Sequence, residues 1–303
     1  MPRPAVTLRG EADESRAAPG VSMRRRPRGT GARMTRKLGA IAAIAVLGAA
    51  VWAAVGGAAT KSSTTTIETQ SLGSAVVKCP KGQRVVAADV HGDAAVSGPR
   101  VVVSTLVRPT ARKLSTQAWN FGDPGELTAI ARCKKRPKAR QVSESTTLEQ
   151  FEEDSVTVRC PKGKRIVFGG FRGEREDAFS APGVFVTAAR RTGARAWTVE
   201  GSNAGDLPGE LRALAYCGKT GKTKTRTDTI SLGQFELGSA EAVCPRGTKV
   251  RYGGFEKVAG TPGRVELHAL ERRGGRRLRV TASEGFYLLP GAEMGLTAIA
   301  YCR

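Results

Sequence analysis

The chain has 303 residues, and its 49 Lys and Arg against 27 Asp and Glu give a formal net charge of +22 at pH 7. Hydrophobic residues make up 40%, as in globular proteins, whereas aromatic residues make up only 5%, which leaves few stacking surfaces for bases. Much of the positive charge falls in residues 1–37, 134–141 and 218–227, so the sequence places it in tails and linkers rather than on one folded face. Charge of this kind attracts polyanions, but no specific nucleic-acid partner is expected.

The N-terminal region divides into a basic tail and an apolar segment. Residues 1–37 are rich in Arg, Pro and Gly without an apolar period, which predicts a disordered cytoplasmic tail. Residues 38–59 carry no charge and are long enough to cross a membrane. Two interpretations stay open: a transmembrane anchor, or a signal peptide cleaved near Ala59, which initiation at Met34 would make compact. Both place the rest of the chain outside the cytoplasm, on the cell membrane or secreted.

One pattern is written three times after a short polar linker at 61–66. Each copy has an alternating stretch, a Cys-Pro-Lys/Arg-Gly turn, several further short apolar stretches and a last stretch that ends in Cys. The regular spacing predicts β-repeats at 65–133, 143–217 and 228–303, joined by basic linkers at 134–141 and 218–227.

The repeat pattern is that of strands. Residues 155–160 alternate polar and apolar side chains, which is the period of a half-buried strand. Five or six such stretches per repeat predict an all-β fold of three tandem antiparallel sandwich-like or barrel-like repeats. The pairs Gly169-Gly170 and Gly253-Gly254 predict a bulge or a close backbone approach, although Ala88-Asp89 stands there in repeat 1.

The six cysteines fall as one pair per repeat. No two have the spacing of a zinc half-site, so no metal site is expected, and pairs in an exported chain predict disulfides. Each bridge would close a loop of about 55 residues and contribute about 4 kcal/mol. The expected bridges are Cys79–Cys133, Cys160–Cys217 and Cys244–Cys302.

Alignment of the three copies assigns structural roles to the polar and aromatic residues that first suggest a site. Trp197 aligns with Leu114 and Leu278, which predicts a core position. Trp119 falls outside that core register, which favours an exposed side chain. Asn120 and the matching Asn203 precede Gly-Asp, which predicts hydrogen bonds to turn backbone, and Glu284 stands there in repeat 3.

Candidates for catalysis are weak. His91 and His268 fall at non-equivalent repeat positions, and residues 218–223 lack the first glycine of a phosphate-binding loop. Acidic groups at 152–154 and at Glu174, Glu176 and Asp177 occur in repeat 2 alone; solvated loops are expected, with calcium binding or a hydrolase site as alternatives. The sequence therefore predicts no catalytic, cofactor-binding or metal-binding residue and no cofactor.

The order Cys-Pro-x-Gly, Gly-Gly-Phe, Trp, Asn and Leu-Thr/Arg-Ala-x-Ala-x-Cys resembles a repeat domain of secreted proteins from high-GC Gram-positive bacteria, over residues 65–303. This family brings no established activity or binding residues. The Cys-Pro-x-Gly turns also resemble, more loosely, those of vitelline membrane outer layer proteins, which form one β-prism. That likeness implies a single threefold prism as an alternative. The long basic linkers favour separate domains instead.

Together these observations predict a non-enzymatic, extracytoplasmic structural or adhesive repeat protein. Anionic cell-wall polymers or a membrane surface are the expected partners, because basic segments favour them. The alternatives are a wall-directed hydrolase and a carbohydrate-binding, lectin-like module.

Overall fold

Strands account for nearly all the regular structure in the described part of the chain, as the alternating pattern predicts. The computed structural model describes residues 59–135, 139–175, 183–261, 264–285 and 293–303. The predicted tail and almost all of the apolar segment 38–59 therefore lie outside the described residues. Within those residues, no helix is long and apolar enough to span a membrane.

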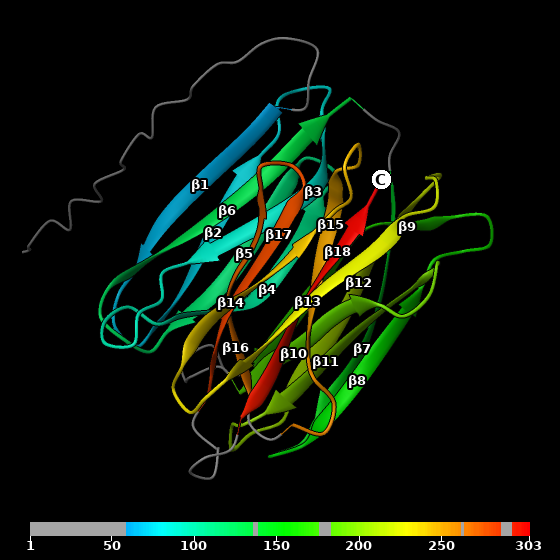
Figure 1. Cartoon of the computed structure of the whole chain (residues 1–303). Coiled ribbons are helices and arrows are strands. Elements are labelled where there is room, and N and C mark those ends of the chain that lie inside the picture. The colour runs from blue at the N-terminus through cyan, green and yellow to red at the C-terminus, as the bar shows by residue number, and fades with distance from the viewer. Residues whose placement is uncertain (1–58, 136–138, 176–182, 262–263, 286–292) are drawn as a thin grey trace, which may run out of the picture. The chain divides into compact units, whose positions relative to one another are not determined.

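Each repeat contributes six strands, which confirms the all-β class and the three antiparallel repeats (Figure 1). Repeat 1 has β1 (Ala59–Ile67), β2 (Ser71–Lys78), β3 (Arg84–Gly92), β4 (Val101–Thr110), β5 (Lys113–Asn120) and β6 (Gly125–Lys134). Repeat 2 has β7 (Arg140–Leu148), β8 (Glu153–Arg159), β9 (Arg165–Arg175), β10 (Val184–Arg191), β11 (Ala196–Asn203) and β12 (Gly209–Gly218). Repeat 3 has β13 (Lys224–Leu232), β14 (Leu237–Val243), β15 (Val250–Lys257), β16 (Val265–Arg273), β17 (Arg277–Glu284) and β18 (Met294–Cys302).

The strand order joins the repeats into one β unit rather than into separate domains. The three six-stranded sheets have the orders β1-β6-β3-β16-β17-β14, β13-β18-β15-β10-β11-β8 and β2-β5-β4-β9-β12-β7. Each sheet thus takes three strands from one repeat and three from another. The pairings β3–β16, β9–β4 and β15–β10 connect the repeats in a closed ring. This arrangement agrees with the threefold alternative and not with separate domains on linkers.

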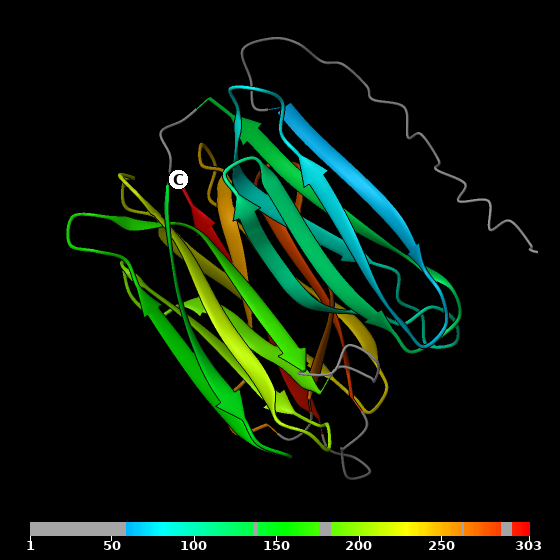
Figure 2. The same ribbon diagram turned by 180° about the vertical axis from the view of Figure 1, so that it is seen from behind.

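Each repeat is also a small sandwich. Its β1-β6-β3 half, or the equivalent, packs on its β2-β5-β4 half, and the two views in Figure 1 and Figure 2 show β1, β6, β2 and β5 lying together. Buried residues of all three repeats form one continuous core cluster. The disulfides Cys79–Cys133, Cys160–Cys217 and Cys244–Cys302 tie the two halves of each sandwich, as predicted, with Cα atoms 5.6, 5.5 and 5.6 Å apart.

The predicted linkers are shorter than the sequence suggests, because their ends are strands. Residues 61–66 belong to β1, residues 140–141 to β7 and residues 224–227 to β13. These are edge strands with alternating half-buried and exposed side chains in β1, so Thr and Ser suit them although they bury little apolar surface.

The paired glycines permit close approach, and the bulge lies just before them. A Cβ on Gly169 would stand 2.1 Å from the Trp197 ring, and one on Gly170 would stand 2.5 Å from the Leu106 carbonyl oxygen. The register of β9 against β12 shifts at Val167, and β3 and β15 shift at Val86 and Arg251. One bulged residue per repeat therefore lies at the same level, and all three line the pocket described below.

Candidate anion-binding site

One end of the β unit is predominantly basic, although Arg190, Arg273 and Arg277 of its hairpins pair with carboxylates on the adjoining strands. This "cystine end" comprises the Cys-Pro-x-Gly turns (78–84, 159–165, 244–251), the hairpins at 108–113, 190–195 and 272–277, the strand ends with adjoining linker residues at 132–135, 139–140 and 217–224, and Arg303. These segments hold more than half of the 49 Lys and Arg residues and none of the 27 Asp and Glu residues.

A repeated contact fixes each hairpin beside its disulfide. The side chains of Arg112 and Arg195 donate to the carbonyl oxygens of Cys79 and Cys160, and Arg276 does the same to Cys244. The backbone amide of each of these cysteines donates in return to the carbonyl oxygen of the same arginine. The basic hairpins are therefore built into the fold and are not loose appendages.

The opposite end is mainly acidic. This "tip end" contains the hairpin tips at 68–70, 149–152 and 233–236 and the loops that follow β3, β5, β11, β15 and β17. Its described loop residues include Glu68, Asp93, Asp123, Glu149, Glu152, Asp206, Glu236 and Glu293, with Arg100 and Arg264 as the basic residues. The prediction that the charge avoids any one folded face is therefore wrong. Antiparallel strands bring every basic turn, hairpin and linker to the same end.

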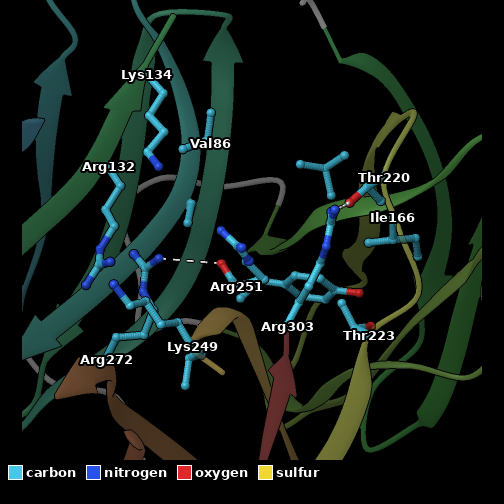
Figure 3. A pocket seen from close by; sticks show the side chains of 14 residues that line it. Val86, Arg132, Lys134, Ile166, Thr220, Thr223, Lys249, Arg251, Arg272 and Arg303 are labelled. Atoms are coloured by element: carbon cyan, nitrogen blue, oxygen red, sulfur yellow. Dashed lines mark hydrogen bonds between the residues drawn. The ribbon is translucent and has the colours of Figure 1, made fainter. Parts of the chain in front are cut away.

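A pocket of about 360 Å³ opens at the cystine end, with walls from all three repeats. Figure 3 shows Arg132 and Lys134 on one side, Thr220, Thr223 and Arg303 on the other, and Lys249, Arg251 and Arg272 between them. Six of the lining residues are Lys or Arg, and none is Asp or Glu. The apolar part of the wall includes Val86, Ala87, Ile166, Val167 and Tyr252.

Two of the three junctions between repeats fill the corresponding space with aromatic rings. Phe168 stacks on Tyr216 with centroids 5.1 Å apart, and Tyr252 stacks on Tyr301 at 4.5 Å. The guanidinium of Arg108 in the neighbouring repeat lies 4.1 Å from the centre of the Tyr216 ring. Burial raises the pKa of Tyr216 to about 12, so its hydroxyl stays protonated while it accepts a hydrogen bond from the Arg108 backbone amide.

Arg191 and Tyr301 repeat this contact. The guanidinium of Arg191 lies 4.6 Å from the centre of the Tyr301 ring, and the Arg191 amide donates to the Tyr301 hydroxyl at 2.7 Å. Side chains of the second linker, Thr223 and Thr225, accept from the same guanidinium. The junction is therefore closed by an aromatic pair beneath an arginine.

The junction between repeats 1 and 3 is different. Ala87 and Arg132 stand where the other repeats place the aromatic pair, and Asp89 stands where they place Gly170 and Gly254. Arg272, the counterpart of Arg108, donates to both Asp89 carboxylate oxygens at 2.7 Å. This ion pair is nearly inaccessible, with side chains 2% and 7% exposed.

Arg132 is the surplus cation of this junction. Burial, followed by the nearby charge of Arg272, lowers the pKa of the Arg132 guanidinium, while Asp89 acts in the opposite direction. No ion pair joins Arg132 to a carboxylate among the described residues. One carboxylate thus serves two guanidinium groups, and a further anion would be stabilised here.

The aromatic and asparagine residues singled out by the repeat alignment have structural roles. Only the burial of Trp119 differs from the prediction. Trp197 is 1% exposed, as predicted, and its indole donates to the Gly170 carbonyl oxygen at 3.1 Å. Trp119 is 8% exposed, so the interpretation that it lies at the surface is wrong. The centre of its ring lies 6.2 Å from that of Phe121, whose ring stacks on Phe185 of repeat 2.

The two asparagines hold turns, as predicted. Asn120 donates to the Ile67 and Asp123 carbonyl oxygens and accepts from the Gly122 amide. Asn203 makes the equivalent bonds in repeat 2. In repeat 3 the Glu284 carboxylate accepts from the backbone amide of Phe235, so a different side chain serves the same loop.

The two histidines lie on neighbouring strands but do not form a catalytic pair. His268 is 1% exposed; its Nδ1 lies 2.8 Å from the Val101 carbonyl oxygen and its Nε2 lies 2.8 Å from Ser283 Oγ. The Glu266 carboxylate contacts Ser283 at 3.4 Å rather than orienting the imidazole. Ser283, His268 and Glu266 are buried and all lie on the paired strands β16 and β17 of repeat 3. Only the contact of His268 with the Val101 carbonyl oxygen reaches repeat 1.

The acidic residues of repeat 2 are engaged in structural contacts. Glu152 accepts from the Glu149 amide at 2.7 Å, Asp154 accepts from the Thr146 hydroxyl at 3.2 Å and Glu174 pairs with Arg172. Glu176 and Asp177 lie outside the described residues. No group of three or more His, Cys, Asp or Glu residues in the described ranges is arranged to hold a metal ion.

Comparison with known proteins finds no match for this chain: no protein-family model matches it, and no curated protein matches it either.

Proposed function

We propose that the protein is a non-enzymatic, extracytoplasmic binding protein that adheres to anionic cell-envelope polymers through its cystine end. The observation that carries this proposal is the gathering of basic turns, hairpins and linkers at one end without any acidic residue among them. A polymer with regularly spaced negative charges could contact several of these segments at once, so weak contacts would add.

The location is part of the same proposal. Three disulfides suit an oxidising compartment outside the cytoplasm. Strand β1 begins at Ala59, so cleavage near that residue would leave the β unit essentially whole. An uncleaved segment 38–59 would instead hold the β unit at the membrane, where the wall polymers are also within reach.

Binding should depend strongly on salt and on the basic end. Lys81, Lys162 and Arg246 occupy the third position of the three Cys-Pro-x-Gly turns and are exposed. Changing all three to Gln removes three exposed charges, and co-sedimentation with purified anionic wall polymer should weaken about tenfold or more at 0.1 M salt.

A matched control adds three negative charges at the tip end, with Thr69→Glu, Ser97→Glu and Gln150→Glu, all at exposed positions. It changes the net charge equally and should leave binding within about twofold, because the tip end lies farther away than a Debye length of about 10 Å. Equal weakening by both triple variants, or binding that does not change with salt, would contradict the proposal.

A carbohydrate-binding role is the second candidate. Phe151 and Phe235 occupy equivalent hairpin tips with positive φ of 59° and 60°, and their exposed fractions are 69% and 45%. Exposed rings at equivalent positions are what a lectin-like module would use, although Gln70 takes this position in repeat 1. Loss of polysaccharide binding in Phe151→Ser with Phe235→Ser, but not in the basic-end variant, would favour this candidate.

A further inference from the structure

We propose that the basic pocket at the cystine end, which includes the junction of repeats 1 and 3, is a specific site for a phosphate group, either free or carried by a polymer. The inference rests on the proposed function and deepens it, because it names the chemical group that the cystine end would select. It is carried by the structure of one pocket and not by the overall charge.

The first observation is that the pocket opens where one junction lacks its aromatic filling. Ala87 occupies the position that Phe168 and Tyr252 have in the other repeats, and Arg132 occupies that of Tyr216 and Tyr301. Both replacements line the pocket. The same strands and bulges are present at all three junctions, so the opening follows from these side chains and not from a different backbone.

The second observation is that the substituted side chains turn the space cationic. Arg272 is neutralised by Asp89, while Arg132, Lys134 and Lys249 add positive charge to the same wall. Arg251 supplies another cation because β15 bulges at this residue, where the other repeats have Val86 and Val167. Several cations around one space favour a doubly charged oxyanion such as phosphate over a single carboxylate.

The third observation concerns the rim and the size. Arg303, which follows β18, extends over the opposite side and donates to the Thr220 hydroxyl of the second linker at 3.2 Å (Figure 3). A volume of about 360 Å³ exceeds the need of one phosphate and falls in the range of small-ligand sites. Val86 and Ile166 give the remaining space an apolar wall, so a phosphate ester fits better than a bare ion.

Isothermal titration calorimetry on the full chain in detergent tests the site, with inorganic phosphate, glycerol phosphate and a glycerol phosphate oligomer as probes. Ionic strength is kept constant with sodium chloride. We expect a Kd of about 1 mM or tighter for glycerol phosphate. Stronger binding of the oligomer than of glycerol phosphate would identify the polymer as the source of the group, and stronger binding of glycerol phosphate would identify a small ester.

The decisive variant restores the filling of the other two junctions, Ala87→Phe with Arg132→Tyr. It should lose phosphate binding by about tenfold to 100-fold, as should Arg132→Gln, which keeps the pocket open and removes one charge. The surface variant with Gln at positions 81, 162 and 246 should stay within about twofold. Arg132→Gln keeps the test decisive if the larger side chains prevent folding.

The outcomes separate the site from the proposed function. Phosphate binding that depends on Arg132, in a protein that does not bind wall polymer, would support the pocket and overturn only the adhesive role. Polymer binding without measurable phosphate binding at 10 mM, on the order of ten times the expected Kd, would overturn the pocket alone. An equal loss in the surface variant would also overturn it, because binding would then follow net charge.

Discussion

The buried pair of Asp89 and Arg272 gives the sharpest stability prediction. Asp89→Asn keeps the shape of the side chain and removes its charge, which leaves the Arg272 guanidinium buried without a counter-charge and close to Arg132. Breaking a buried pair from one side costs about 3–5 kcal/mol. For a β unit of this size each kcal/mol corresponds to about 2–4 °C in Tm, so the expected decrease is roughly 6–20 °C.

Thermal unfolding in non-reducing buffer, followed by tryptophan fluorescence, measures this effect. The matched control is Glu210→Gln, which breaks the half-exposed pair with Arg212, where the side chains are 36% and 35% exposed; it should cost less than about 1 kcal/mol. The double variant Asp89→Asn with Arg272→Met should recover most of the lost Tm, because it removes the unpaired charge and leaves an apolar side chain of similar length.

The result that would refute this reasoning is a Tm for Asp89→Asn within about 2 °C of the unmodified protein, which would place the pair in the range of surface ion pairs. Phosphate provides an independent check. If the pocket binds this anion, saturating phosphate should raise the Tm of Asp89→Asn more than that of the unmodified protein, since the anion supplies the missing charge.

Three further effects are expected. Replacing Cys160 and Cys217 by Ala should lower the free energy of unfolding by about 4 kcal/mol in urea, and an unchanged midpoint would contradict a structural role for this bridge. Gly170→Ala should cost about 1–3 kcal/mol because its Cβ would meet a β4 carbonyl oxygen at 2.5 Å, whereas Gly193→Ala, with its nearest neighbour at 3.7 Å, should cost less than about 0.5 kcal/mol. Burial lowers the pKa of His268 below 6.5, so the unfolded chain takes up a proton there that the folded protein does not; this contribution to stability is complete above about pH 6.5 and is lost as the pH falls through the lowered pKa. The stability difference between the unmodified protein and His268→Gln should therefore shrink from pH 8 to pH 5, and a constant difference would show that His268 does not titrate.

The strands and disulfides could be predicted because their signals are local or repeated. Alternation over six residues marks a strand, and similar cysteine spacing in three copies, at separations of 54, 57 and 58 residues, leaves one simple pairing within each repeat. The core position of Trp197 could be predicted because its counterparts are leucines. The turn hydrogen bonds of Asn203 could be predicted because a short polar side chain before Gly-Asp suits a turn.

The closed ring could not be predicted in the same way, because its pairings join strands from different repeats. Only two residue pairs define each junction, such as Ala269 with His91 and Leu270 with Val90, and neither has a sequence signature. The stacking of Phe121 on Phe185 depends on the same ring, since Phe185 belongs to the next repeat. The basic end could not be predicted for the same reason. Its segments lie far apart in the sequence and meet at one end only when the strands pair.

The departure from threefold similarity at one junction also argues against a purely structural origin for the pocket. A repeat that had merely lost its aromatic pair would be stabilised best by small or apolar side chains in its place. Here the replacement is Arg132, a second guanidinium beside Arg272, while Asp89 supplies only one carboxylate for both. That arrangement lowers the stability of the charged form of Arg132 unless an anion binds. Preorganised positive charge of this kind costs folding free energy, and binding can offset that cost, so the least symmetric part of the unit is where a ligand is expected.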